Sequence, residues 1–127
     1  MNKVAISTPH APEAVGPYSQ AIRCGSLLFC SGQIGIDPAT KKVVDGGVEA
    51  QARQIFKNIN ALLSEAGVGM PNIVKATVFL KDMADFKAVN AIYAENFELP
   101  YPARSAVAVK ELPLSVDIEI EVIATLE

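Results

Sequence analysis

The sequence predicts a single α/β domain in which two helices cover one face of a mixed β-sheet. The chain has 127 residues, the length of one ordinary domain. Six segments have the apolar alternation or continuous apolar run of a strand, and two others repeat apolar residues at intervals of three and four. Turn residues separate these segments without a repeat or a linker, so we expect one domain over residues 1–127.

Three strands are expected in the first third of the chain, over residues 4–7, 18–24 and 27–33. The last two flank Gly25-Ser26, a dipeptide typical of a tight hairpin, because glycine supplies the positive φ that the turn needs. A proline-rich loop is expected over residues 8–17. Residues 34–47 contain Asp-Pro and Asp-Gly-Gly turn markers and are also expected to be a loop.

The clearest helix covers residues 48–66 and is expected to end at Gly67. Its apolar residues form one stripe: Val48, Ala52, Ile55, Phe56, Ile59, Leu62, Leu63 and Ala66. Residues 73–80 are β-branched and apolar on both faces, which predicts a central strand.

A second helix of similar length is expected over residues 83–97, with Asp85 near its start. Its inward residues would be Phe86, Val89, Ile92, Tyr93 and Phe97. The last two strands are expected over residues 103–109 and 116–126.

The sheet face without helices must also be covered, because the strands carry too many apolar residues for water. The residues expected there are Ile34, Ile36, Val107, Val109 and Ile123. A monomer with such a face would associate nonspecifically, so we expect a symmetric homo-oligomer.

Composition excludes several classes of protein. The net charge is −3 and the lysines are scattered, which argues against a nucleic-acid-binding surface. No apolar run approaches the ~20 residues of a membrane span. Cys24 and Cys30 fit no zinc or redox spacing and are expected to pack as small hydrophobes on neighbouring strands. With one histidine, His10, and no apolar signal segment, we expect a cytoplasmic protein without a metal.

An arginine, Arg104, lies in the small apolar segment YPARS (residues 101–105), where a strand is expected to begin. A guanidinium keeps its charge, so Arg104 requires a carboxylate partner if it is buried. Ala106 and Ala108 share its strand face and leave space beside it. Two interpretations remain open: a structural ion pair, or the anchor for an anionic ligand.

The last strand places Glu119 and Glu121 on one face with Ile123. Charges on this face are typical of a solvated edge strand. Alternatively, one glutamate lies in a pocket and acts as a general base, and alternation does not choose between the two.

Three weaker signals have structural and functional interpretations. Tyr18 follows a rigid Gly-Pro turn, where a tyrosine either packs or donates its hydroxyl to a ligand. Gly32, after Ser31, interrupts an apolar strand, which is typical of a bulge or a close backbone approach. Asn90 lies mid-helix as a solvated residue or as a fixed amide donor.

Five motifs, spread over nearly the whole chain, resemble the RidA (YjgF) family in content and order. They are GPYSQA (16–21), SGQI (31–34), NAIY (90–93), YPARS (101–105) and IEIE (118–121). The resemblance implies a chorismate-mutase-like fold and a homotrimer around a central barrel, with ligand clefts at the subunit interfaces. It also implies 2-iminobutanoate/2-iminopropanoate deaminase activity without a cofactor, which protects pyridoxal-phosphate enzymes from reactive enamines and imines.

The resemblance implies that Arg104 binds the substrate carboxylate and that Glu119 activates water. The further cleft residues that it implies are Tyr18, Ser31, Gly32 and Asn90, some of them from a neighbouring subunit. Many bacterial members have a cysteine where this chain has Ala106. The mechanism uses no thiol, so we expect activity to survive the difference.

Two other functions compete with this one. A non-catalytic module, either a 2-oxo-acid sensor or a holdase chaperone, would use the same arginine pocket. An endoribonuclease is disfavoured, because no basic stripe interleaved with aromatic residues and no histidine pair is found in the sequence. The sequence does not rank the imine substrates.

Overall fold

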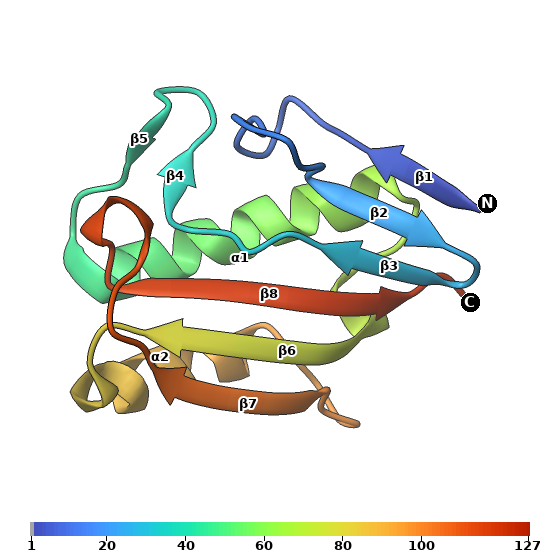
Figure 1. Ribbon diagram of the computed structural model, residues 1–127. Helices are drawn as coiled ribbons and strands as arrows, with labels where there is room; N and C mark the ends of the chain where they lie inside the picture. The colour runs from blue at the N-terminus through green and yellow to red at the C-terminus, as the bar shows by residue number, and fades with distance from the viewer. Residues whose placement is uncertain (1) are drawn as a thin grey trace.

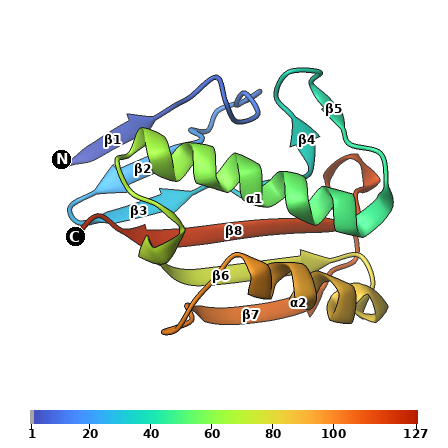
Figure 2. The same ribbon diagram turned by 180° about the vertical axis from the view of Figure 1, so that it is seen from behind.

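The computed structural model describes residues 2–127 and contains a six-stranded mixed sheet with two helices on one face (Figures 1 and 2). The helices are α1 (Gly47–Glu65) and α2 (Phe86–Glu95). The strands are β1 (Lys3–Ile6), β2 (Ala21–Cys24), β3 (Leu27–Cys30), β4 (Ile36–Asp37), β5 (Lys42–Val43), β6 (Ile73–Leu80), β7 (Ala103–Ala108) and β8 (Ile118–Thr125).

The strand order of the large sheet is β1-β2-β3-β8-β6-β7, and only β6 and β7 are parallel. Because parallel neighbours need a crossover connection, α2 joins these two strands across one face of the sheet. The expected central strand is confirmed, since β6 pairs with β8 on one side and with β7 on the other. β1 and β7 are the two edges.

The core lies between the helices and one face of the sheet. The stripe of α1 is confirmed: Ile55, Ile59, Leu62 and Leu63 are fully buried. Alternate residues of β8 meet the helices, and these are Ile118, Ile120, Val122 and Ala124. Full burial of one such aliphatic side chain contributes roughly 1.5–3 kcal/mol, so this face is the main source of stability.

The other face of the sheet has no helix over it (Figure 1). Phe29 is 42% exposed and Val107 is 44% exposed, and Ile123, which is paired with Phe29, is half-buried. An apolar open face is therefore confirmed. The placement of Ile36 there is wrong, because Ile36 belongs to β4 in a separate two-stranded sheet.

Several element boundaries differ from the expectation. β2 begins at Ala21 rather than residue 18, and β3 ends at Cys30 rather than residue 33. The segment 34–47 contains the β4–β5 hairpin instead of loop alone. Strands of two residues are too short to show alternation, so no sequence pattern marks them.

The second helix is shorter than expected and is not of similar length to the first. α2 has 10 residues against 19 in α1, because residues 83–85 form a 3-10 turn. Asp82 begins this turn by accepting a hydrogen bond from the backbone N–H of Ala84 at 2.9 Å, whereas the Asp85 side chain caps nothing. Phe97 lies beyond the helix but is buried as expected.

The turn glycines and the cysteines can be compared with their expected positions. Gly25 and Gly67 have φ of 61° and 83°, which confirms the hairpin turn and the helix end. The cysteines lie on the neighbouring strands β2 and β3, but only Cys30 is buried, and burial raises the pKa of its thiol to about 12. Cys24 is exposed, so its expected packing is wrong.

Over residues 2–127, no helix is long and apolar enough to cross a membrane.

Candidate functional site

Arg104 lies on the edge strand β7 and points to the helix-covered face of the sheet. Its Cα is paired with that of Ala76 in β6, which is fully buried under the helices. The Nη1 group of Arg104 donates a hydrogen bond to Oδ1 of Asn90 at 2.6 Å. The guanidinium carbon lies 5.2 Å from the ring centroid of Phe86 and 4.6 Å from that of Tyr93.

All three partners of Arg104 come from α2. Phe86, Asn90 and Tyr93 are spaced by four and then three residues, so they share one helix face. The helical pattern of the sequence predicts core positions for the two aromatic residues and does not connect them to Arg104. The signal that was available is this helical spacing, which places the rings on the same face as Asn90.

Arg104 has no carboxylate partner in the part of the chain that the structure describes. The one ion pair found there joins Arg53 to Glu95 at 2.8 Å. The interpretation of Arg104 as half of an internal ion pair is therefore wrong. Its partners within the chain are a neutral amide and two π faces, which hold the guanidinium without neutralising its charge.

Glu119 lies on the opposite face of the sheet. Its neighbours on β8, Ile118 and Ile120, point into the core, and its Cα is paired with that of Phe79 in β6. Burial raises the pKa of the Glu119 carboxyl above its ordinary value, and the nearby charge of Glu121 raises it further. Glu119 is half-buried and Glu121 is exposed, so the structure separates two residues that alternation left equivalent.

The segment after β3 passes directly beside Glu119. Gln33 and Ile120 exchange backbone hydrogen bonds of 2.8 and 3.0 Å, which bring this segment against β8. A Cβ atom built on Gly32 would lie 2.9 Å from Cδ of Glu119 and closer still to its Oε2 oxygen. Gly32 is thus the close approach that its position in an apolar strand predicted.

Ser31 and Tyr18 belong to the same region of the chain. The Ser31 hydroxyl donates to the backbone oxygen of Ser19 at 2.6 Å, which ties residue 31 to the segment that carries Tyr18. Tyr18 is 52% exposed, and its backbone N–H donates to the oxygen of Gly16 at 2.8 Å.

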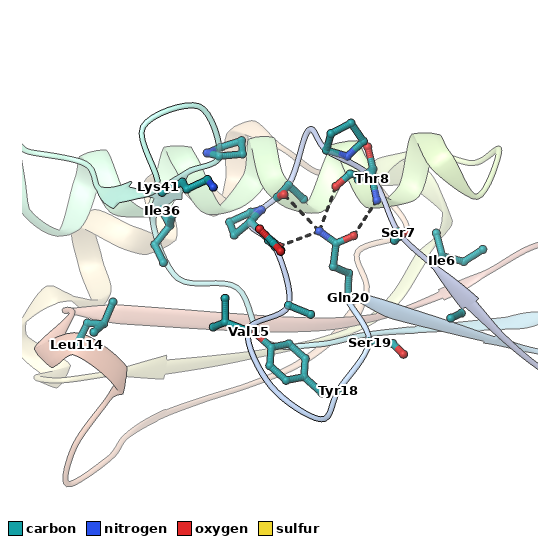
Figure 3. Close-up of a pocket in the computed structure, with 17 residues that line it drawn as sticks. Ile6, Ser7, Thr8, Val15, Tyr18, Ser19, Gln20, Ile36, Lys41 and Leu114 are labelled. Carbon is teal, nitrogen blue, oxygen red and sulfur yellow. Dashed lines mark hydrogen bonds between the residues drawn. The ribbon is translucent and has the colours of Figure 1, made fainter.

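Gln20 fixes the loop that leads to Tyr18, a role that the sequence interpretation missed (Figure 3). Its side-chain oxygen accepts from the N–H of Thr8 at 2.7 Å, and its side-chain nitrogen donates to the oxygens of Thr8, Ala11 and Pro12. A buried glutamine with four such bonds replaces the backbone pairing that the loop lacks. Its signal in the sequence is a polar residue where the strand begins.

The same loop borders a cavity of about 870 Å³, shown in Figure 3. Residues 5–9, 11–15, 18–20, 36, 38, 41 and 114 line it. Tyr18 is the one residue of the candidate site among them, and neither Arg104 nor Glu119 contributes. The cavity therefore lies beside the candidate site and does not contain its charged groups.

One chain brings the predicted residues together in two groups. Arg104 and Asn90 form the first group, which we call the anchor half, with the rings of Phe86 and Tyr93. Glu119, Gly32 and Ser31 form the second, which we call the carboxyl half, near Tyr18. The two halves lie on opposite faces of the sheet, so one copy of the chain does not bring Arg104 and Glu119 to the same ligand.

Comparison with known proteins shows similarity over nearly the whole chain. The family described as Endoribonuclease L-PSP matches residues 8–126. "Reactive Intermediate Deaminase A, chloroplastic" of Arabidopsis thaliana is 49% identical over 126 residues, which are 99% of this chain and 67% of that protein. "2-iminobutanoate/2-iminopropanoate deaminase" of Capra hircus is 48% identical over 119 residues, which are 94% of this chain and 87% of that protein.

Solved structures show the same similarity in three dimensions. The crystal structure of RidA from an Antarctic Psychrobacter has a TM-score of 0.92 and 43% identity, covering 96% of this chain and 98% of that one. The crystal structure of E. coli TdcF with bound serine also has a TM-score of 0.92, with 41% identity and coverage of 97% and 98%.

Proposed function

The chain belongs to the Endoribonuclease L-PSP family, which includes the RidA deaminases, and from that premise we propose that it hydrolyses reactive 2-imino acids and their enamine tautomers. The products are 2-oxo acids and ammonia. The deaminase names of relatives that share nearly half of the sequence support this proposal. The proposed reaction needs no cofactor, and a cytoplasmic location remains a prediction from the sequence.

The observation that carries the proposal is the unneutralised guanidinium of Arg104. Nη1 is held by Asn90, and the guanidinium has further N–H donors on the same planar group. A carboxylate that accepts two parallel hydrogen bonds fits this fork better than a point anion does. We assign Arg104 to the substrate carboxylate.

We propose that two copies of the chain complete each site. Because the anchor half and the carboxyl half lie on opposite faces, Arg104 of one copy and Glu119 of another must meet the same substrate. The apolar residues of the open face, including Phe29 and Val107, would be covered in the same assembly. A closed ring of three copies satisfies both requirements, and we propose this homotrimer.

The mechanism uses Glu119 as the base that activates water. As the water oxygen bonds to C2 of the protonated imine, Glu119 accepts a water proton and the C=N electron pair moves to nitrogen. Glu119 then returns the proton to nitrogen, the C–N bond breaks, and ammonia leaves. As the C–N bond breaks and the C2=O bond forms, the hydroxyl of the adduct gives its proton to the Glu119 carboxylate, which passes it to solvent water. Burial raises the pKa of Glu119, so its carboxylate accepts the proton more readily than an exposed one would.

The remaining candidate residues have supporting roles. Asn90 positions Arg104 through its side-chain oxygen. Gly32 leaves the space that the Glu119 carboxyl occupies, and Ser31 fixes the segment that contains Gly32. Tyr18 is exposed beside this segment, and we propose that its hydroxyl contacts the substrate.

A coupled assay tests the proposal. A threonine dehydratase generates 2-iminobutanoate, semicarbazide traps what remains, and the trapped product is measured with and without the protein. We expect the wild type to deplete it. Arg104→Ala and Glu119→Gln should each lower the hydrolysis rate by roughly 10²-fold or more, the usual contribution of a positioned acid–base group or anchor.

Two matched controls make the assay specific. Arg53→Ala removes the exposed arginine of an ion pair with Glu95, and Glu121→Gln removes the exposed neighbour of Glu119. Both should retain at least half of the activity. A wild type that binds a 2-oxo acid without depleting the imine would indicate a sensor, and a wild type that cleaves RNA instead would indicate an endoribonuclease.

A further inference from the structure

The ring of Tyr93 lies beneath the group that we assign to the substrate carboxylate. We propose that Tyr93 is a positioning residue: together with Phe86, its ring fixes the direction of the Arg104 guanidinium and so sets the affinity for the substrate carboxylate. This inference rests on the proposed function and adds to it. It concerns how the anchor is held, which neither the sequence motifs nor the family relatives' names indicate.

The contacts of Arg104 restrict the guanidinium in two ways. Two ring centroids lie within the ~6 Å at which a cation and a π face attract, at 4.6 Å for Tyr93 and 5.2 Å for Phe86. The hydrogen bond to Asn90 fixes rotation about the long axis of the side chain. An exposed arginine without these contacts samples many rotamers and loses that freedom when it binds an anion.

Tyr93 is itself held firmly. It is only 6% exposed, and its ring lies 6.1 Å from Phe56 at 71° and 4.5 Å from Phe97. Its burial and the edge contact with Phe56 fix the ring plane against the core. The anchor is therefore connected to the rigid interior through a ring, although Arg104 lies on an exposed edge strand.

The contribution of the Tyr93 ring can be tested separately from that of its hydroxyl. Within residues 2–127 this oxygen is buried and has no hydrogen-bond partner. A phenylalanine would keep the ring and remove a buried polar group that no bond satisfies, so the fold should tolerate Tyr93→Phe. If the ring positions Arg104, the same substitution should also preserve ligand binding.

The test measures binding of 2-oxobutanoate by titration calorimetry, together with KM and kcat for the imine. Tyr93→Phe should change the dissociation constant by less than about twofold, whereas Tyr93→Leu should weaken binding about tenfold, the upper range of a cation–π contact. KM should rise by the same factor as the dissociation constant while kcat changes little, because the carboxylate contact is present in both the ground state and the transition state.

Phe97→Leu is the matched control for packing. It removes a ring from the same aromatic cluster, and Phe97 touches Phe56 and Tyr93 but is not among the rings that lie under Arg104. We expect it to lower the melting temperature as much as Tyr93→Leu does while leaving binding within about twofold. If Tyr93→Leu does not fold, Phe86→Leu provides the same measurement from the less buried ring.

The outcomes distinguish this inference from the proposed function. Equal loss of binding in Phe97→Leu and Tyr93→Leu would show a general packing effect and overturn the inference. Equal loss in Tyr93→Phe and Tyr93→Leu would assign the effect to the hydroxyl and also overturn it. A wild type that binds 2-oxobutanoate but hydrolyses no imine overturns the proposed function alone, and the ratios between variants still decide the role of Tyr93. A wild type that does not bind 2-oxobutanoate overturns the inference.

Discussion

Arg104 lies on the helix-covered face of the sheet and contacts three side chains of α2. Glu119 lies on the open face, and no side chain of residues 2–127 donates a hydrogen bond to its carboxylate. The anchor half is built within one chain and has a fixed geometry. In the carboxyl half, Gly32 lies against the Glu119 side chain, and that side chain is still partly exposed.

The difference follows from the chemistry of the two groups. A guanidinium keeps its charge at any relevant pH, so its surroundings can be rigid and still leave it ready for an anion. A carboxylate that moves protons must remain able to change its charge, and partial burial raises the pKa of Glu119 toward the range where this happens. The anchor half is thus complete within one chain, and under the proposed function assembly and water complete the carboxyl half.

The largest effect should come from recombining the two halves. Arg104→Ala and Glu119→Gln chains are each expected to be inactive alone. If each site takes its arginine from one copy and its glutamate from another, unfolding and refolding an equal mixture should restore about a quarter of the wild-type activity, because one site in four then has both intact groups in any closed ring. The measurement is imine hydrolysis per chain after refolding.

The control for recombination is the same mixture without refolding, which should stay inactive if the assembly exchanges slowly. A mixture that stays inactive after refolding into assemblies of the wild-type size would contradict the two-chain site. It would require Arg104 and Glu119 to act within one copy, against their positions on opposite faces of the sheet.

A pair of glycine substitutions sharpens the comparison, because both glycines border close contacts with different partners. Gly32→Ala should lower activity roughly 10²-fold, since displacing a reacting group by about 1 Å has that cost. Its stability should change little, because the Glu119 carboxyl is the end of a flexible side chain and can move away.

Gly35→Ala should do the reverse. A Cβ atom there would lie 2.8 Å from the Cα of Gln51 in α1, so backbone must move. We expect a loss of about 1–3 kcal/mol in the free energy of unfolding, measured by urea denaturation, with activity largely retained in the folded fraction. Equal loss of stability in both variants would contradict the assignment of Gly32 to the carboxyl half.

The helices and strands with long apolar patterns could be predicted from the sequence. The expected helix over 48–66 differs by one residue at each end from α1, and the strand expected over 73–80 has the bounds of β6. The two-residue strands of the β4–β5 hairpin carry no pattern and were missed. The family could also be predicted, because its five motifs are contiguous and appear in order.

The arrangement of the site could be predicted only in part. Alternation correctly placed Glu119 and Glu121 on one face of the sheet. The greater burial of Glu119 comes from Gly32, which is brought against Glu119 by the backbone pairing between Gln33 and Ile120. Such a long-range contact leaves no local signal. The partner of Arg104 could not be predicted for a similar reason, since charge balance indicated a carboxylate while the chain supplies an amide and two rings.

The smallest effect concerns the stability cost of the carboxyl half. Burial and the charge of Glu121 raise the pKa of Glu119, so the folded chain binds this proton more tightly than the unfolded chain does. The wild type therefore loses stability as pH rises through the raised pKa, and a neutral glutamine avoids that loss. Glu119→Gln should be more stable than the wild type at pH 7, on the order of 0.5 kcal/mol, because the half-exposed carboxyl is screened by water.

The pH dependence distinguishes this cost from a packing effect. The gap between Glu119→Gln and wild type should close as pH falls below 4.5, the ordinary pKa of a glutamate, because the carboxyl is then protonated in both the folded and the unfolded chain. Urea denaturation at a series of pH values measures the gap. A gap that stays constant with pH would indicate altered packing beside Gly32. A gap that closes would show that the fold keeps a partly buried charge at a cost in stability, as expected of a group retained for proton transfer.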